Sequence, residues 1–420
     1  MGIKVIQGGT LIDGTGKLPL KDSLVIVEGP KITAVGRKGE VVFPEAEGIE
    51  IIEAEGKTVM PGLIDSHLHM KGNGESKEYY MIPIRNNGMD RAMKAVPNLK
   101  KTLEMGFTTI RDGGSGYSWM DVALRNAINR GDILGPRYLA TGYHLTVTGG
   151  HGYGLPPWFG KFAPAEQVGM FCDGPEEWRK AARLNIYNGT DNIKVVASRG
   201  FTTAGLSGDA GLVAAQPTVN ELRAAVEEAH KMGKKTSAHA NGPQAIMNAI
   251  EAGIDSIVHG FYMNEKCAEL MVKNNVALEA TTLCIKLLKD LGAGEMLDEA
   301  VHTAKEYWKI KEKEFKMILE AGVTISFSTD MGCPYLFHGE NAREFACMVE
   351  LGMSPMAAIV SATKSAANTV GLGDKIGTVE EGKLADIIVV DDDPLKNIAV
   401  LEKAENIRMV MKGGEVVITR

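Results

Sequence analysis

Two of the nine histidines in this 420-residue chain, His67 and His69, alternate at the end of a short apolar run. Alternate residues of a strand point to the same side, so we expect both imidazoles to face one interior. His239, His259 and Asp330 each end a later apolar run. Imidazole nitrogens and a carboxylate form a donor set that suits Zn, Mn or Co. These five residues are therefore predicted to be metal ligands, and the chemistry they suggest is metal-assisted hydrolysis.

A lysine, Lys194, follows Ile193 in another apolar run. A strand lysine ordinarily lies on a solvated face or in an ion pair, and that interpretation stays open. If Lys194 points toward the histidines, two divalent ions would repel its ammonium group. A carbamate formed from Lys194 and CO2 would instead be an anionic bridge between two metal ions. Lys194 is thus a sixth candidate ligand.

The elements that must position these side chains are short apolar runs alternating with longer helical segments, a pattern typical of βαβ units. The runs are residues 63–69, 108–112, 138–144, 193–197, 236–240, 256–259, 277–281 and 324–330. The sequence Thr218-Val219-Asn220-Glu221 is a capping box that predicts the start of one helix. Eight such units predict an α/β protein with a (β/α)8 TIM barrel, whose catalytic residues lie at the carboxyl ends of the strands.

Both ends of the chain are rich in short β-branched runs separated by turn signals such as Asp13-Gly14 and Gly413-Gly414. We therefore predict two domains. Residues 1–60 and 371–420 are expected to form one small β-sandwich, and residues 61–370 the metallohydrolase barrel.

Composition excludes several other classes of protein. The net charge is −7, which offers no basic surface for nucleic acid or an anionic membrane. No run approaches the roughly 18 apolar residues of a membrane span, and the first residues do not form a signal peptide. Five cysteines without CxxC spacing indicate reduced thiols and a cytoplasmic protein rather than disulfides or a thiolate metal site.

Three blocks of the chain resemble hallmarks of the amidohydrolase superfamily: residues 8–14 (GGTLIDG), 61–69 (PGLIDSHLH) and 377–386 (GTVEEGKLAD). The resemblance spans almost the whole chain. It implies a binuclear site in which His67, His69 and Asp330 hold one metal ion, and His239 and His259 the other. Carboxylated Lys194 and a hydroxide would bridge the two ions, which are expected to be Zn, with Mn or Co as alternatives.

Within the superfamily, the chain looks most like the imidazolonepropionase-like and Xaa-Pro or Xaa-Arg dipeptidase branch. This resemblance rests on residues 148–152 (TGGHG), 193–194 (IK) and 338–342 (HGENA). Two departures matter. The dipeptidases usually place a Tyr where this chain reads Ala215-Gln216-Pro217-Thr218, and the deaminases place a Glu where it has Gly242. The second departure argues against a deaminase.

Some other group must therefore polarise the substrate carbonyl in place of that Tyr. His144 and His151 are the preferred catalytic candidates, beside Asp330 as general base and then general acid. Substrate contacts are expected from four further residues near the strand ends: Tyr143, Arg199, Tyr262 and His338.

The function that follows is hydrolysis of an amide-type C–N bond in a small molecule, either an N-acyl amino acid or dipeptide, or a carbamate or urea-like compound. One alternative is a mononuclear hydrolase of a cyclic amide with an unmodified Lys194. Another is a non-catalytic scaffold, but such proteins lose metal ligands, and here every expected position is filled. The resemblance further implies a homo-oligomer.

Overall fold

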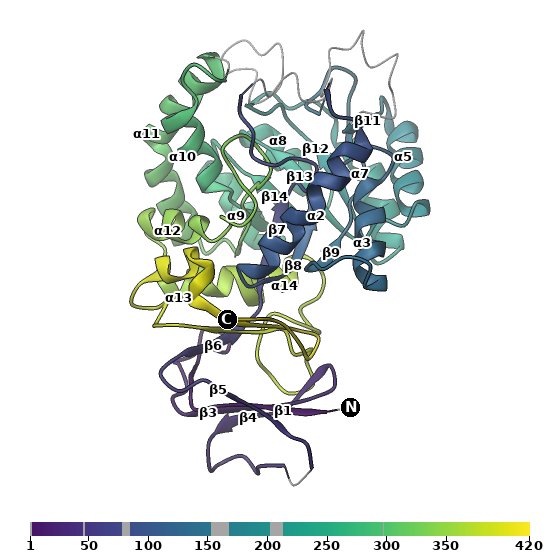
Figure 1. Ribbon diagram of the computed structural model, residues 1–420. Helices are drawn as coiled ribbons and strands as arrows, with labels where there is room; N and C mark the ends of the chain where they lie inside the picture. Colours follow the sequence, from purple (N-terminus) through teal and green to yellow (C-terminus); the bar gives the residue numbers. More distant parts are fainter. Residues whose placement is uncertain (1, 45–46, 78–84, 153–167, 202–212, 297) are drawn as a thin grey trace.

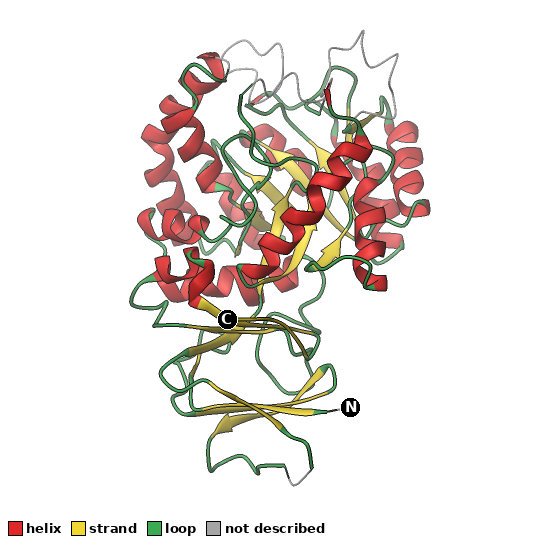
Figure 2. Ribbon diagram, viewed as in Figure 1, coloured by secondary structure: helices red, strands yellow, loops and turns green. Residues whose placement is uncertain are grey.

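The computed structural model describes residues 2–44, 47–77, 85–152, 168–201, 213–296 and 298–420. The chain has an α/β fold in which parallel strands occupy the middle and helices surround them (Figure 2). The terminal segments form separate strands below this part, at the bottom of the view in Figure 1.

Two sheets are built from the two ends of the chain. The first has the order β4-β3-β1-β5, with β1 Ile3–Gln7, β3 Ser23–Glu28, β4 Lys31–Arg37 and β5 Glu50–Glu53. The second has the order β19-β18-β17-β6-β2, with β2 Thr10–Leu11, β6 Thr58–Pro61, β17 Ile387–Val390, β18 Ile407–Lys412 and β19 Glu415–Thr419.

The second of these sheets joins the two ends directly. Strand β17 runs antiparallel to β6, with Ile387 opposite Pro61. Apolar residues of both sheets, such as Ile6 and Val25 from the first and Val389 from the second, belong to one buried cluster. Strands β3 and β17 are nevertheless buried along almost their whole length, so apolar residues lie on both faces of these strands.

The central strands lie in two parallel sheets. The smaller has the order β7-β8-β9, with β7 Leu63–Leu68, β8 Phe107–Asp112 and β9 Arg137–Leu139. The larger has the order β11-β10-β12-β13-β14-β15-β16, with β10 His144–Thr146, β11 Gly169–Phe171, β12 Asn192–Val196, β13 Lys235–Ala240, β14 Ser256–His259, β15 Ala277–Glu279 and β16 Ile325–Ser326.

Hydrogen bonds connect these two sheets at both edges. The Ser66 amide donates to Phe327 O (2.9 Å), and the Asp330 amide donates to His67 O (2.9 Å). On the other side, the Asp191 amide donates to Ala140 O (2.7 Å). The chain that follows β16 therefore lies against β7, and the chain that follows β9 lies against the start of β12.

Two of the predicted strands differ from the structure. The run 138–144 is divided into β9 and β10, so that His144 begins a strand instead of ending one. Gly142 causes the division, because its φ of +75° is incompatible with a continuous strand. The run 324–330 is regular only over Ile325–Ser326, since the chain beyond it turns toward β7.

Helices follow most of the parallel strands. They are α2 Gly88–Glu104, α3 Met120–Arg130, α5 Pro175–Tyr187, α7 Val219–Lys231, α8 Pro243–Glu251, α9 Glu265–Lys273, α10 Thr282–Leu291, α11 Asp298–Glu320, α12 Arg343–Glu350, α13 Pro355–Val360 and α14 Ala366–Thr369. The predicted capping box is confirmed, because Thr218 accepts from the Glu221 amide at the start of α7. Among the described residues, no helix combines the length and apolar character needed to cross a membrane.

Candidate active site

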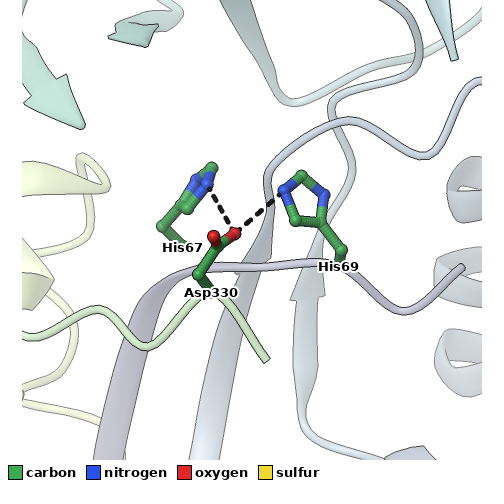
Figure 3. Close-up of side chains that lie close together, drawn as sticks. All are labelled: His67, His69 and Asp330. Carbon is green, nitrogen blue, oxygen red and sulfur yellow. Dashed lines mark ion pairs between the residues drawn. The ribbon is translucent and has the colours of Figure 1, made fainter. Parts of the chain in front are cut away.

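The carboxylate of Asp330 lies between the imidazoles of His67 and His69 (Figure 3). Asp330 Oδ1 is 3.5 Å from His67 Nε2 and 3.2 Å from His69 Nε2. One ligand atom from each residue falls within 4.8 Å of the others, the geometry of a potential metal site. As predicted from the sequence, His67 and His69 at the end of β7 lie close to Asp330, which follows β16.

A buried carboxylate, Asp65, holds these three ligands in place. It accepts hydrogen bonds from the His67 amide (3.2 Å), from Thr329 Oγ1 (2.5 Å) and from Asn341 Nδ2 (2.8 Å). Burial raises the pKa of Asp65 to about 7 despite these donors. Because Thr329 immediately precedes Asp330, Asp65 fixes the two halves of the ligand set relative to each other.

Three residues of this region adopt left-handed backbone conformations that non-glycine residues rarely take. The φ angles are +68° at His259, +45° at Thr281 and +61° at Asp330. Such strain costs about 1–3 kcal/mol per residue and collects at functional sites. Two of the three residues are predicted metal ligands, and Thr281 contacts one of them.

The remaining predicted histidines lie next to this group. His259 Nδ1 is 2.8 Å from Thr281 Oγ1, and the His239 and His259 ring centroids are 4.6 Å apart. His239 Nε2 is 2.9 Å from the carbonyl oxygen of Arg199. In the tautomer whose Nε2 donates to this carbonyl, Nδ1 of His239 keeps a lone pair for a metal ion.

Ring contacts connect six imidazoles across the site. His67 is 5.0 Å from His69 and 5.7 Å from His259, measured between centroids. His151 stacks on His239 at 4.4 Å, and His144 is parallel to His151 at 6.5 Å. His151 is therefore directly beside a predicted metal ligand, and His144 lies next to His151.

Gln216 determines where His151 lies. Its side-chain oxygen accepts from the His151 amide at 3.3 Å, and its own amide donates to Ala197 O at 3.0 Å. Gln216 belongs to the stretch in which the dipeptidases usually carry a Tyr. This stretch thus contacts the backbone of His151, a predicted catalytic residue.

Lys194 points into the same interior from β12. It is 3% exposed, and among the described residues its Nζ has no hydrogen-bond partner. Burial lowers the pKa of Lys194 to about 7, opposed by Glu279 and reinforced by Arg111. A neutral amine is the nucleophile that reacts with CO2, so this environment favours the species that forms a carbamate.

The donor set fits divalent metal ions. Burial, followed by the charge of Lys194, lowers the pKa of His67, and burial lowers that of His259 to about 3. Neutral imidazoles are the forms that bind metals. Burial opposes ionisation of Asp330, but His67 and His69 keep its pKa well below its usual value. Its Oδ1 takes part in no hydrogen bond within the described part of the chain.

Gly113 lets the imidazoles pack this closely. A Cβ at this position would lie 2.3 Å from His67 Cε1 and 2.6 Å from His69 Cε1. Any larger side chain would displace both rings. The loop after β8 is therefore part of the site.

The other predicted substrate-binding residues contact neighbouring groups of the protein. Tyr143 Oη accepts from the Ser118 amide (2.8 Å), and its ring is edge-on to Trp119 at 5.0 Å. Tyr262 packs on Tyr307 at 4.7 Å. His338 Nε2 is 3.0 Å from Gly72 O and 3.3 Å from His69 O, so it supports the backbone after the histidine pair.

Sequence interpretation missed Asp65, Gly113 and Lys71 as site residues. Lys71 had no clear signal in the sequence, because β7 ends at Leu68 and Lys71 lies in the turn that follows, where strand alternation no longer applies. Gly113 had none, since its importance comes from the approach of two side chains from another strand. Asp65 belongs to the block 61–69 that resembles the superfamily, but its hydrogen bond with Thr329 can be seen only in the folded structure.

Comparison with known proteins identifies the family of this chain. Residues 58–417 match the sequence pattern described as the amidohydrolase family. An ochratoxinase from Aspergillus niger is 31% identical over 98% of this chain and 86% of its own length. A crystal structure described as an Xaa-Pro dipeptidase with bound methionine in the active site is 31% identical, with a TM-score of 0.87 over 99% of both chains. A prolidase complexed with N-methylphosphonate-L-proline is 28% identical, with a TM-score of 0.88 over 100% of both chains.

Proposed function

The chain belongs to the amidohydrolase family and is a hydrolase of C–N bonds, and from that premise we propose a binuclear enzyme that cleaves N-acyl amino acids or dipeptides. The observation that carries the proposal is the buried set of His67, His69 and Asp330, with His239 and His259 beside it. His67, His69 and Asp330 hold one ion, and His239 and His259 the other.

Lys194 joins the two halves of the proposed site as a carbamate. Its buried Nζ without a partner among the described residues supports this role. A carbamate would supply two anionic oxygens between the ions. When bound, two ions, which we propose to be Zn with Mn or Co as alternatives, supply a hydroxide nucleophile at neutral pH and polarise the substrate carbonyl.

The protein's own side chains handle the protons. Asp330 accepts the proton of the nucleophile and delivers it to the leaving nitrogen, which requires an ionised carboxylate at the start. The imidazoles of His67 and His69 favour that form. His151, stacked on His239, donates a hydrogen bond to the carbonyl oxygen, and His144 lies parallel behind it.

The proposed substrate class takes support from two of the neighbours. One is a dipeptidase with bound methionine, and the other is a prolidase in complex with a phosphonate derivative of proline. Both compounds contain an amino-acid carboxylate. The absence of the dipeptidase Tyr from residues 215–218 extends the proposal beyond dipeptides to other N-acyl amino acids. Tyr143, Arg199, Tyr262 and His338 remain proposed as substrate-binding or supporting residues.

We also propose the remaining architectural features. The two parallel sheets form one closed (β/α)8 barrel over residues 61–370, supported by the hydrogen bonds at both sheet edges. Residues 1–60 and 371–420 form a β-sandwich, supported by the core shared between the two terminal sheets. A cytoplasmic homo-oligomer with a small-molecule substrate is proposed from the composition and the resemblance.

A mononuclear hydrolase of a cyclic amide is the second candidate. The observation that favours it is that only His67, His69 and Asp330 form a compact ligand group among the described residues. In that enzyme Lys194 would remain an amine, and its removal would leave the metal content unchanged.

A panel of amides tests the proposed function. The protein is stripped with a chelator, reloaded with Zn, Mn or Co, and offered N-acyl amino acids, dipeptides, cyclic amides and carbamates. We expect metal-dependent release of an amine from N-acyl amino acids or dipeptides. Exclusive cleavage of cyclic amides would select the second candidate, and hydrolysis that survives metal removal would contradict both.

A further inference from the structure

We propose that Lys71 binds the carboxylate of the substrate, which makes N-acyl α-amino acids with a free carboxylate the preferred substrates. This inference deepens the proposed function and rests on it. The evidence is the place of the Lys71 ammonium group, the engagement of both carboxylate oxygens of Asp112 by other donors, and the contacts that fix its backbone.

The Lys71 ammonium group lies at the loop that lines the metal site. Its Nζ donates to the carbonyl oxygen of Gly114 at 2.8 Å. A Cβ on Gly114 would be 3.2 Å from His144 Nδ1, and one on the preceding Gly113 would be 2.3 Å from His67 Cε1. The loop that holds Lys71 therefore touches a proposed metal ligand and a proposed catalytic residue.

The pKa shifts of three histidines also indicate that Lys71 lies near them. Burial and then the charge of Lys71 lower the pKa of His69, His144 and His151. One cation acts on three imidazoles that come from different segments of the chain. The ammonium group thus lies close enough to these three imidazoles for its charge to affect them.

Within the described residues, no carboxylate forms an ion pair with Lys71. The nearest candidate is Asp112, whose oxygens are engaged elsewhere. Its Oδ1 accepts from the Gly114 amide (2.8 Å), and its Oδ2 accepts from the Met70 amide (3.0 Å) and Tyr138 Oη (2.7 Å). Lys71 is half-buried and has no counter-ion among the described residues, so an anionic ligand is the partner that would compensate its charge.

The backbone around Lys71 is fixed from two sides. Asp112 holds the Met70 amide, and Arg91 Nη1 donates to Lys71 O at 3.1 Å. Arg91 is itself stacked over the Tyr117 ring, 4.6 Å from its centroid. The ammonium group is consequently preorganised, which reduces the entropy lost when a carboxylate binds.

The test compares pairs of substrates that differ only in the carboxylate. The metal-loaded protein is assayed with N-benzoyl-L-amino acids and with the N-benzoyl amines that lack the carboxylate. Lys71→Met removes the charge at similar length, and Lys71→Arg retains it. The matched control is Lys94→Met, which removes an exposed charge on α2. Metal content and melting temperature confirm that each variant is folded and loaded.

We expect Lys71→Met to lower kcat/KM for the carboxylates by about 10–100-fold, mainly through KM, the range of one charge-assisted hydrogen bond. The values for the decarboxylated amides should stay unchanged, and Lys71→Arg should recover part of the loss. An equal loss on both substrates, or on neither, would overturn the role of Lys71 while leaving the proposed function intact.

If no amide is hydrolysed, the proposed function fails, and the same compounds then serve as ligands. Calorimetric binding of N-benzoyl-L-amino acids that Lys71→Met abolishes would preserve the carboxylate site. Equal binding by the unsubstituted protein and Lys71→Met, or no binding by either, would overturn the inference as well.

Discussion

Asp330 uses its two oxygens differently. Oδ1 faces His67 and His69, while Oδ2 lies 3.6 Å from Cys284 Sγ, which donates a weak hydrogen bond. In the proposed mechanism, Oδ1 would lie with the metal ligands and Oδ2 would accept the proton. The proposed role of the carboxylate therefore depends on its charge and not only on its shape.

Asp330→Asn should lower kcat by at least about 100-fold, because an amide of the same shape cannot accept the proton. Steady-state hydrolysis of the best amide substrate measures the effect. Asp374→Asn, at an exposed position, is the matched control and should retain full activity. If Asp330→Asn and the control had comparable activity, Asp330 would not be the proton acceptor.

Gly113→Ala should weaken metal binding by more than about tenfold, since a methyl group placed 2.3 Å from the His67 ring forces it to move. Competition with a chromophoric chelator measures the metal affinity. Gly2→Ala is the control, because nothing lies within 4 Å of that position. Unchanged affinity in Gly113→Ala would show that the loop after β8 does not constrain the imidazoles.

The alternation of His67 and His69 predicts their common direction, because strand geometry is local. His239, His259 and Asp330 are found at strand ends by the same reasoning, and the structure brings all of them to the same interior. The close approach of Gly113 and the hydrogen bonds of Asp65 depend on segments far apart in the chain, so local patterns cannot reveal them.

Among the elements, α11 contributes a buried network that supports the loop after His259. Lys311 Nζ lies 3.1 Å from Tyr307 Oη and 3.3 Å from Glu314 Oε2, and Glu314 Oε1 accepts from the Met263 amide at 2.7 Å. Both charges are almost fully buried. The network fixes the helix to the loop that leaves β14.

Lys311→Met should destabilise the fold by about 3–5 kcal/mol, because Glu314 would keep a buried charge without its cation. Chemical denaturation measures the loss. The double variant Lys311→Met/Glu314→Gln should regain part of it, and Lys309→Met, which breaks an exposed pair on the same helix, should cost at most about 1 kcal/mol. Equal losses in Lys311→Met and Lys309→Met would contradict the argument.

The predicted strands are mostly confirmed at this scale, and the exceptions have local causes. Gly142 interrupts the run 138–144 with its positive φ, and the chain after Ser326 leaves regular geometry to reach β7. Helix α2, by contrast with these shortened strands, continues through Pro97, although proline ordinarily ends a helix. Tertiary packing outweighs propensity in these segments.

For the molecule as a whole, one ion pair connects the terminal strands to the parallel sheet. Asp386, just before β17, pairs with Arg137 at the start of β9 and accepts from the Gly413 amide at 2.7 Å. The pairing of the two ends of the chain could be anticipated, since both are strand-rich. Their register, and this contact with the middle of the chain, could not.

Asp386→Ala should lower the free energy of unfolding by about 1–3 kcal/mol, because it removes the acceptor of the half-buried donors of Arg137 and Gly413. Denaturant titration measures it, and the metal content should not change, since the pair is outside the site. Asp391→Ala breaks a more exposed pair with Arg408 and should have a smaller effect. A loss of metal in Asp386→Ala would mean that the terminal strands shape the active site.

The number of metal ions bound per chain tests the central claim most directly. Elemental analysis of the purified, metal-loaded protein should give two equivalents, and Lys194→Ala should retain fewer because the proposed bridge is lost. Lys194→Arg, which keeps a charge but forms no carbamate, should behave like Lys194→Ala. One equivalent in the unmodified protein, with full occupancy and activity in Lys194→Ala, would contradict the binuclear account.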